Sequence, residues 1–282
     1  MKRVLKSLFV LSSVAVLLTG CNNKSEDDAD GEGDVTQANI TDITDGTGYY
    51  ESIKASMSEG EDGEFRQALT TLVKPSGTVD YSSGLSTHLQ QADADSDNSS
   101  NMIFFYTQKS VKKQSAGTWN REHCWPQSDS NGCWGKTNAG CDMLHIRPTY
   151  SKTNSDRGNL KYGEVSGSYL VYEGCEYGKK GTYFEPLDKV KGDCARITMY
   201  VWTAWHDYYG NKLPAITNNF QSIDLMMKWH FADLPSQQEI NRNDYVQTTV
   251  QKNRNPFVDH PEYACKIWGN HSDTTKSLCG LK

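Results

Sequence analysis

Apolar residues are distributed very unevenly along this chain. Residues 8–18 form an apolar stretch broken only by two serines, which is too short to span a bilayer comfortably. A long polar stretch follows, and aromatic and aliphatic residues return from Tyr49 onward. In 64–73 the residues Phe65, Leu69 and Leu72 recur at helical spacing, so we predict a helix there.

The middle of the chain alternates between short apolar runs and polar stretches. Residues 102–107 form a run typical of a buried strand. Two further strands are predicted at 119–125 and 142–147, the second ended by Pro148. The polar segments 109–118 and 128–140 are expected to be loops.

The remaining pattern is mainly helical. Helices are predicted at 149–159, 193–209, 222–231, 235–252 and 261–268. In 193–209 one apolar stripe contains Ile197, Tyr200, Val201, Ala204, Trp205 and Tyr208. The pattern therefore predicts an α+β fold, a mainly helical single domain around a small sheet.

The N-terminus has the features of an export signal. Lys2, Arg3 and Lys6 precede the apolar stretch, as in a secretory signal peptide. Residues 18–21, Leu-Thr-Gly-Cys, resemble a bacterial lipobox, which predicts cleavage after residue 20 and lipid on Cys21. The alternative is an ordinary signal peptide that ends near a cysteine.

Residues 21–48 are expected to be a flexible tether. They contain eight acidic residues, one lysine and no aromatic residue, a composition that buries too little apolar surface to fold. Residues 49–282 are long enough for one domain with a substantial core. We thus predict an exported protein anchored by lipid to a bacterial membrane, at the outer membrane or cell surface, with the periplasm as an alternative, and a monomer.

Cysteine usage agrees with export. Besides Cys21 there are seven cysteines, which an exported protein can pair as disulfides. Because seven is odd, one is expected to be free or to pair with another chain. The sequence alone does not give the connectivity.

The net charge of −6 at first argues against a nucleic-acid partner, since polyanion binders usually have a basic face. Residues 101–161, however, have nine Lys and Arg against four Asp and Glu, a net charge of +5. An uneven surface would explain this as well as a binding site would.

The same segment contains the side chains that could perform catalysis. Within residues 120–159 it combines a carboxylate, two histidines, several amides and basic side chains. Phosphodiester hydrolysis requires a base to deprotonate water and a hard cation to neutralise the phosphate. Oxygen ligands from Glu and Asn suit Mg²⁺.

Several motifs resemble the bacterial endonuclease I family. Residues 119–126, Trp-Asn-Arg-Glu-His-Cys-Trp-Pro, are similar to its Asn-Arg-Glu-His-Val-Trp-Pro signature. Asp142, with His-Ile-Arg-Pro at 145–148, resembles a second motif of the family, and 153–159 a third. The similarity continues in order through 184–196, 225–230 and 253–261.

The resemblance implies a ββα-metal, or His-Me finger, nuclease. His123 would be the general base, and Glu122 and Asn154 would hold one Mg²⁺, or alternatively Ca²⁺ or Mn²⁺. Arg196 and Arg157 are candidates for holding phosphate. The residues expected to be structural or to support the metal ligands are Asp142, His145 and Asn159.

The sequence departs from the family at three places. An extra residue before His145 puts the role of that histidine in doubt. Cys124 replaces the usual valine, as a buried thiol or as a disulfide partner of Cys133 or Cys141. No arginine matches the one that some relatives have before the second strand, where this chain has Lys136.

Two alternatives remain open. The local group of Cys124, Cys133, Cys141, His123 and His145 could bind zinc, although it lacks the close cysteine spacing of structural zinc sites. The chain could also be a catalytically inactive, lipid-anchored protein that only binds nucleic acid. DNA and RNA are not distinguished as substrates.

Overall fold

The computed structural model describes residues 43–82, 84–113, 117–129 and 133–282 of the chain. The predicted signal peptide, Cys21 and most of the predicted tether lie outside these residues. The end of the tether lies against the domain, because the Gly46 amide donates to the Ile53 carbonyl at 2.9 Å. Among the described residues, none of the helices is both long and apolar enough to cross a membrane.

The domain is α+β, as predicted, and contains three small sheets in its described part. The helices are α1 (Glu64–Val73), α2 (Leu85–Ala92), α3 (Ser151–Arg157), α4 (Asp188–Tyr209), α5 (Ile223–Ala232), α6 (Gln237–Tyr245), α7 (Pro256–Asp259), α8 (Tyr263–Trp268) and α9 (Asp273–Leu278). The strands are β1 (Asn101–Phe104), β2 (Lys109–Lys112), β3 (Trp119–His123), β4 (Ile146–Tyr150), β5 (Lys161–Tyr162), β6 (Tyr169–Tyr172), β7 (Cys175–Lys180) and β8 (Tyr183–Glu185).

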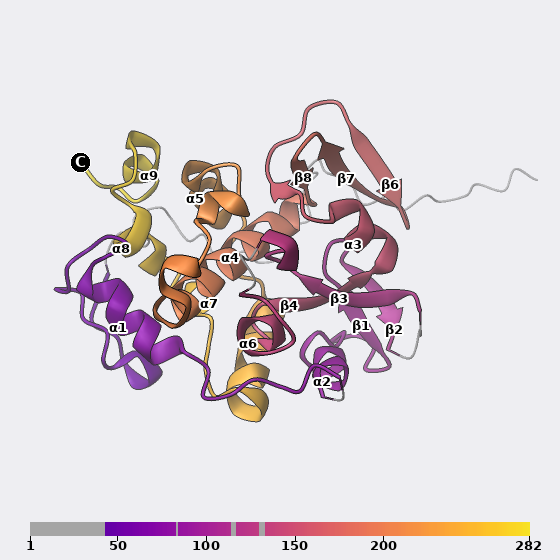
Figure 1. The fold of residues 1–282 in the computed structure, drawn as a ribbon, viewed down its shortest axis with the longest axis horizontal. Coiled ribbons are helices and arrows are strands. Elements are labelled where there is room, and N and C mark those ends of the chain that lie inside the picture. Colours follow the sequence, from indigo (N-terminus) through magenta and orange to yellow (C-terminus); the bar gives the residue numbers. More distant parts are fainter. Residues whose placement is uncertain (1–42, 83, 114–116, 130–132) are drawn as a thin grey trace, which may run out of the picture.

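Helix α4 forms the centre of the domain. It lies between α1, α8 and α9 on one side and the strands on the other (Figure 1). Nearly every residue from Val190 to Trp205 is buried, since a helix packed on all sides needs an apolar surface all round. Trp202 and Trp205 are core residues, but Tyr208 at the end of the predicted stripe is 51% exposed.

Helix predictions were correct in position but not always in extent. The helix at 64–73 is confirmed. α4 begins five residues before the predicted 193, at Asp188. The predicted helix 235–252 is α6 followed by a π-helical turn at Val246–Val250.

The strand predictions need two corrections. The expected loop at 109–118 contains β2, which pairs antiparallel with β1; its alternate residues are exposed, so a polar sequence can form this ribbon. Pro148 does not end the second strand but lies inside β4, which begins at Ile146, so residues 142–145 of the predicted strand lie before β4, mostly in a turn. The Pro148 carbonyl accepts a hydrogen bond from the Phe105 amide at 2.8 Å, so it points away from β3. The nitrogen of a strand residue points to the same side as its carbonyl, so the missing N–H of Pro148 costs no hydrogen bond to β3.

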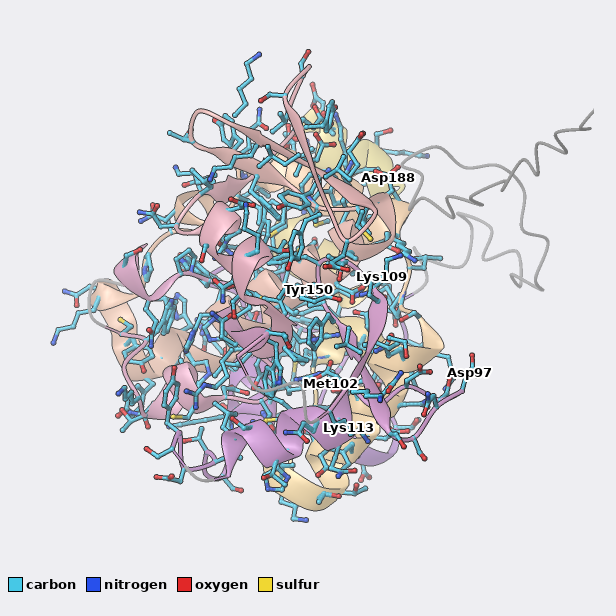
Figure 2. The ribbon with its side chains drawn as sticks, turned by 90° about the vertical axis from the view of Figure 1, so that its right-hand side faces the viewer. Asp97, Met102, Lys109, Lys113, Tyr150 and Asp188 are labelled. Carbon is cyan, nitrogen blue, oxygen red and sulfur yellow. A yellow bond between two sulfur atoms is a disulfide. The ribbon has the colours of Figure 1, made fainter. Side chains whose placement is uncertain are left out.

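The ribbon β1–β2 packs on β4 through a small second core. Met102, Phe104 and Tyr150 are buried together there, and the Phe104 and Tyr150 rings meet edge to face at 4.6 Å. Figure 2 shows Met102 and Tyr150 on this face, with Lys109 and Lys113 nearby. The four-stranded sheet, in the order β5-β8-β7-β6, was not predicted.

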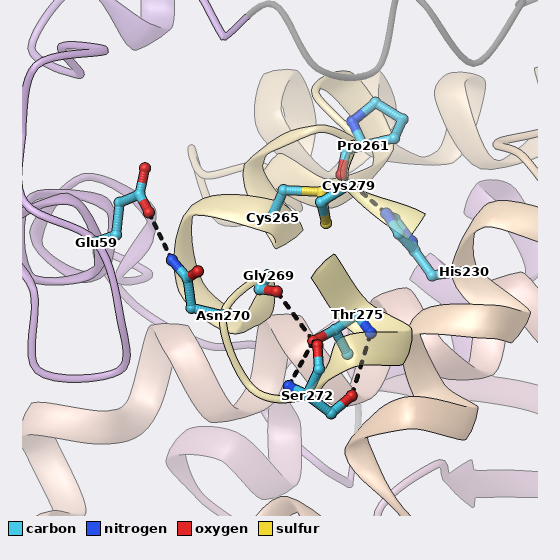
Figure 3. The surroundings of a disulfide bond; sticks show 9 residues. All are labelled: Glu59, His230, Pro261, Cys265, Gly269, Asn270, Ser272, Thr275 and Cys279. Carbon is cyan, nitrogen blue, oxygen red and sulfur yellow. Dashed lines mark hydrogen bonds between the residues drawn. A yellow bond between two sulfur atoms is a disulfide. The ribbon is translucent and has the colours of Figure 1, made fainter. Parts of the chain in front are cut away.

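The cysteines also differ from expectation. Cys265 and Cys279 form a disulfide that joins α8 to the end of α9 (Figure 3). Four described cysteines have free thiols, not one: Cys124, Cys133, Cys141 and Cys194, all buried. Cys124 is therefore not a disulfide partner of Cys133 or Cys141, and burial raises its pKa to about 12, which keeps it a protonated apolar side chain.

Candidate active site

Strands β3 and β4 and helix α3 form a compact ββα unit. The two strands pair antiparallel, with Glu122 opposite Arg147 and His123 opposite Ile146. Helix α3 follows β4 directly and packs on both strands. This is the local architecture that the sequence resemblance implied.

The unit brings together the three residues predicted to perform catalysis. Glu122, His123 and Asn154 all line one pocket of about 460 Å³, which is also lined by Tyr81, Arg121, Pro126, Gln127, Ser128, Gly158 and Asn159. Neighbouring residues on a strand normally face opposite sides. Glu122 and His123 reach the same pocket because β3 ends at His123, where the regular alternation ends too.

Glu122 is a buried carboxylate held in a fixed orientation. The Tyr106 hydroxyl donates to its Oε1 at 2.6 Å, and Arg157 Nη1 lies 3.2 Å from the same oxygen. Among the described residues, Oε2 is thus the oxygen left to face the pocket. Burial raises the pKa of Glu122, while Arg157 and Tyr106 act in the opposite direction.

His123 is oriented by the protein backbone. Its Nε2 lies 3.0 Å from the Gly140 carbonyl oxygen, which can only accept a hydrogen bond. Nε2 therefore carries the hydrogen of the neutral ring, and Nδ1 is the nitrogen that can take a proton. Burial, reinforced by nearby His145, lowers the pKa of His123 to about 3, so the ring is neutral near pH 7.

Hydrogen bonds also fix the orientation of the Asn154 side-chain amide. Its Nδ2 donates to Asn120 Oδ1 at 2.7 Å and to the Arg121 carbonyl at 3.4 Å. Because a backbone carbonyl cannot donate, these bonds fix which amide atom is nitrogen. Within the described part of the chain Asn154 Oδ1 accepts no hydrogen bond, so it can bind a cation.

Glu122 and Asn154 fit a hard divalent cation. Both offer oxygen to one pocket, which suits Mg²⁺ and leaves positions for water and phosphate. A buried carboxylate with a raised pKa is also stabilised in its charged form by a nearby cation. Within the described residues there is no group of three or more His, Cys, Asp or Glu that could hold a metal, so the zinc alternative finds no support there.

Arg157 does not lie where a phosphate could reach it. Its side chain is fully buried, and its guanidinium donates to the carbonyls of His123 and Cys124 at 3.1 and 2.7 Å. A third bond runs to Asn219 Oδ1 at 2.9 Å. The prediction of a phosphate-holding role needs correction: Arg157 supports Glu122 and the end of β3 from behind.

The prediction for Arg196 needs the same correction. Arg196 is fully buried in α4 and is bound by Glu239 through two hydrogen bonds of 2.8 and 2.6 Å. Asp193 adds an ion pair at 3.2 Å. With its charge neutralised in the core, Arg196 is a structural residue outside the pocket.

Asp142 and His145, two of the residues expected to be structural or to support the metal ligands, are both buried and do not line the pocket. Asp142 is buried and accepts four hydrogen bonds, from Tyr200, Trp205, Gln251 and the Leu144 amide. His145 joins the 3-10 turn at Asn138–Cys141 to β3's end: Nδ1 donates to the Ala139 carbonyl at 2.8 Å, and Nε2 accepts from the Trp125 amide at 3.1 Å.

Asn159 differs from these two residues. It is exposed and lines the pocket, and among the described residues no hydrogen bond of its side chain is found. Its expected supporting role stays a prediction, and its exposed amide at the pocket is available to a ligand.

Sequence reasoning overlooked the cation that does face the pocket. Arg121 lines it, with Nη1 donating to the Tyr81 carbonyl at 2.6 Å and the guanidinium 4.1 Å from the centre of the Tyr81 ring. Lys136 lies over the same ring at 5.6 Å. The signal was present in the sequence, because Arg121 precedes Glu122 and shares a strand face with His123.

The remaining histidines lie away from the pocket lining. His230 is one of them: it is buried, and its Nε2 donates to the Pro261 carbonyl at 2.9 Å beside the disulfide (Figure 3). Burial and Arg196 lower the pKa of His230 to about 3. His230 is therefore a buried structural residue.

His230 should make the fold sensitive to acid. An unfolded histidine binds a proton below pH ~6.5, whereas folded His230 does not until about pH 3, so stability falls with pH between these values. His230→Gln, which can keep the bond to Pro261, should escape this effect. From pH 7 to pH 5, we expect wild type to lose about 2 kcal/mol of unfolding free energy relative to the variant. Urea denaturation at both pH values measures it; equal losses would contradict a neutral buried His230.

Comparisons relate this chain to a known family and to known proteins. The family model described as Endonuclease I matches residues 62–262. The chain is 33% identical over 248 residues to an extracellular ribonuclease of Bacillus amyloliquefaciens, covering 83% of this chain and 82% of that protein. It is 32% identical over 237 residues to an extracellular ribonuclease of Bacillus subtilis (strain 168), covering 78% of each.

Proposed function

The chain belongs to the endonuclease I family and is a nuclease, and we propose that it is an exported, metal-dependent ribonuclease that also accepts DNA, with little sequence preference. The observation that carries the mechanism is the shared pocket of Glu122, His123 and Asn154. The extracellular relatives support export and RNA as a substrate. Lipid on Cys21, one ion per site and a monomeric state are further parts of the proposal.

His123 acts as the general base in this mechanism. With Nε2–H held by the Gly140 carbonyl, Nδ1 takes a proton from the attacking water as the water attacks phosphorus. The same hydrogen bond then stabilises the imidazolium that forms. The low pKa of His123 keeps the imidazole ring unprotonated before the reaction.

Glu122 and Asn154 would hold the divalent ion through their oxygens. When bound, the ion supplies positive charge to the phosphate and to the leaving oxygen. Arg157 keeps Glu122 in place from behind. Arg121, rather than Arg157 or Arg196, binds a phosphate oxygen, since it lines the pocket and its guanidinium has donors beyond the one used on Tyr81.

Metal removal tests this function against the inactive-binder alternative. The full domain should degrade a structured RNA and supercoiled plasmid with Mg²⁺, lose activity in EDTA, and regain it when Mg²⁺ is restored. Gel analysis of both substrates measures cleavage. A protein that only retards the substrates, with or without Mg²⁺, would be a binder and would contradict the proposal. Cleavage that continues unchanged in EDTA would contradict the metal.

A further inference from the structure

A second pocket adjoins the active site. It has a volume of about 340 Å³ and is lined by Asn159, Leu160, Lys161, Thr182 and Asn218. Asn159 lines both pockets, so they lie next to each other at this residue. None of the proposed catalytic side chains belongs to the second pocket.

Three chain segments build this pocket and are tied together by their backbones. The Lys161 amide donates to the Thr182 carbonyl at 2.9 Å, and the Tyr162 amide donates to the Asn219 carbonyl at 2.7 Å. Lys161 Nζ donates to the Thr217 carbonyl at 2.7 Å. The pocket is therefore formed before a ligand arrives, with its ammonium group in a fixed place.

The lining has the chemistry of a nucleotide site. Lys161 uses one of the three donors of its ammonium group on Thr217, which leaves the others for a phosphate oxygen. Asn159 and Asn218 are exposed, and among the described residues neither amide has a side-chain hydrogen bond. Free amides can donate to and accept from base edges and ribose hydroxyls.

The shape of the pocket favours an unpaired strand. A volume of about 340 Å³ lies within the range of small-ligand sites. A base can enter such a concave site only when it is not paired in a duplex. Of the residues that the structure describes, none that lines this pocket is aromatic, so binding there depends on phosphate and hydrogen bonds rather than on stacking.

We propose that this second pocket binds a neighbouring nucleotide of the substrate strand, and that it gives the enzyme a preference for single-stranded polynucleotides. The inference rests on the proposed nuclease function and adds a subsite to it. Lys161 holds the phosphate of that nucleotide, and Asn159 and Asn218 bind its base or sugar.

The test compares a polymer with a minimal substrate. We would measure kcat/KM for a single-stranded RNA 12-mer, for its duplex and for bis(p-nitrophenyl) phosphate, with Mg²⁺. Lys161→Ala and Asn218→Ala should each lower the value for the 12-mer, about tenfold for Lys161, and by much more than for the small diester. The preference of wild type for the 12-mer over the duplex should shrink in both variants.

Controls keep the outcomes distinct. Lys228→Ala removes an exposed lysine of α5 and should match wild type, and Lys161→Arg should retain most activity. Lys161→Ala should also reduce the slope of log KM against log salt concentration for the 12-mer, by about the amount expected for one lost phosphate contact. Thermal melting of each variant shows whether it is folded.

Each result has one meaning. If wild type cleaves no substrate, the proposed function fails. If wild type cleaves the 12-mer and both variants cleave it equally well, the subsite is wrong although the nuclease stands. If folded Lys161→Ala loses the same factor on the 12-mer and on the small diester, Lys161 serves the reaction centre and the subsite is again overturned.

Discussion

Replacing His123 with alanine is expected to lower kcat on RNA by about a thousandfold or more. A general base contributes roughly 10² to 10⁴ to the rate, and His123 is the group in the pocket whose Nδ1 can take a proton from water. KM should change little, because His123 acts on the attacking water and not on the bound strand. Steady-state kinetics on a single-stranded RNA measure both values.

The control for this experiment is a histidine that the mechanism does not use. His271 is exposed, and His271→Ala should keep wild-type kinetics. Melting temperatures show whether His123→Ala remains folded, since its ring contacts His145 and Tyr81. A folded His123→Ala that cleaves RNA at the wild-type rate would overturn the assignment of the base.

Replacing Arg157 with alanine should destabilise the protein by about 3–5 kcal/mol, because it leaves the buried Glu122 charge without its partner. It also removes hydrogen-bond donors from the buried carbonyls of His123 and Cys124, which adds to the cost. Activity should fall as well, since Glu122 and His123 lose their support. Urea denaturation gives the change in unfolding free energy.

Two comparisons separate this supporting role from a direct contact with phosphate. Arg157→Lys keeps the charge but not the planar set of donors, so it should regain only part of the stability. Arg121→Ala should also lower kcat/KM but, unlike Arg157→Ala, with little loss of stability. If Arg157→Ala is as stable as wild type and mainly raises KM, Arg157 binds substrate and our correction is wrong.

The site could be predicted from sequence only as far as the contacts are local. Glu122 and His123 are neighbours in one motif, and Asn154 follows within the next two elements, so a single ββα unit brings them together. The order of those elements can be read from the sequence. The roles of the distant arginines cannot be read from it, because the burial of an arginine depends on which elements pack around it.

Arginine residues show this limit most clearly. Sequence similarity marked Arg157 and Arg196 as phosphate-binding, but both are buried. Arg157 lies against the end of β3 and Asn219, and Arg196 lies against α6, where Glu239 neutralises its charge. The position of Arg121 beside Glu122 was a signal for the pocket, but only the fold shows that Tyr81, from a segment 40 residues away, orients its guanidinium there.

The sequence by itself determined the helical periods, the α+β class, the endonuclease I family and the three residues at the centre of the pocket, since each depends on short-range pattern or on motifs. Only the tertiary structure decided which charges are buried, which thiols remain free, how β2 and Pro148 fit into ribbons, and that a second pocket adjoins the first through Asn159. These features depend on contacts between residues far apart in the chain, and their free energies come from burial and neighbouring charge, which no local pattern specifies.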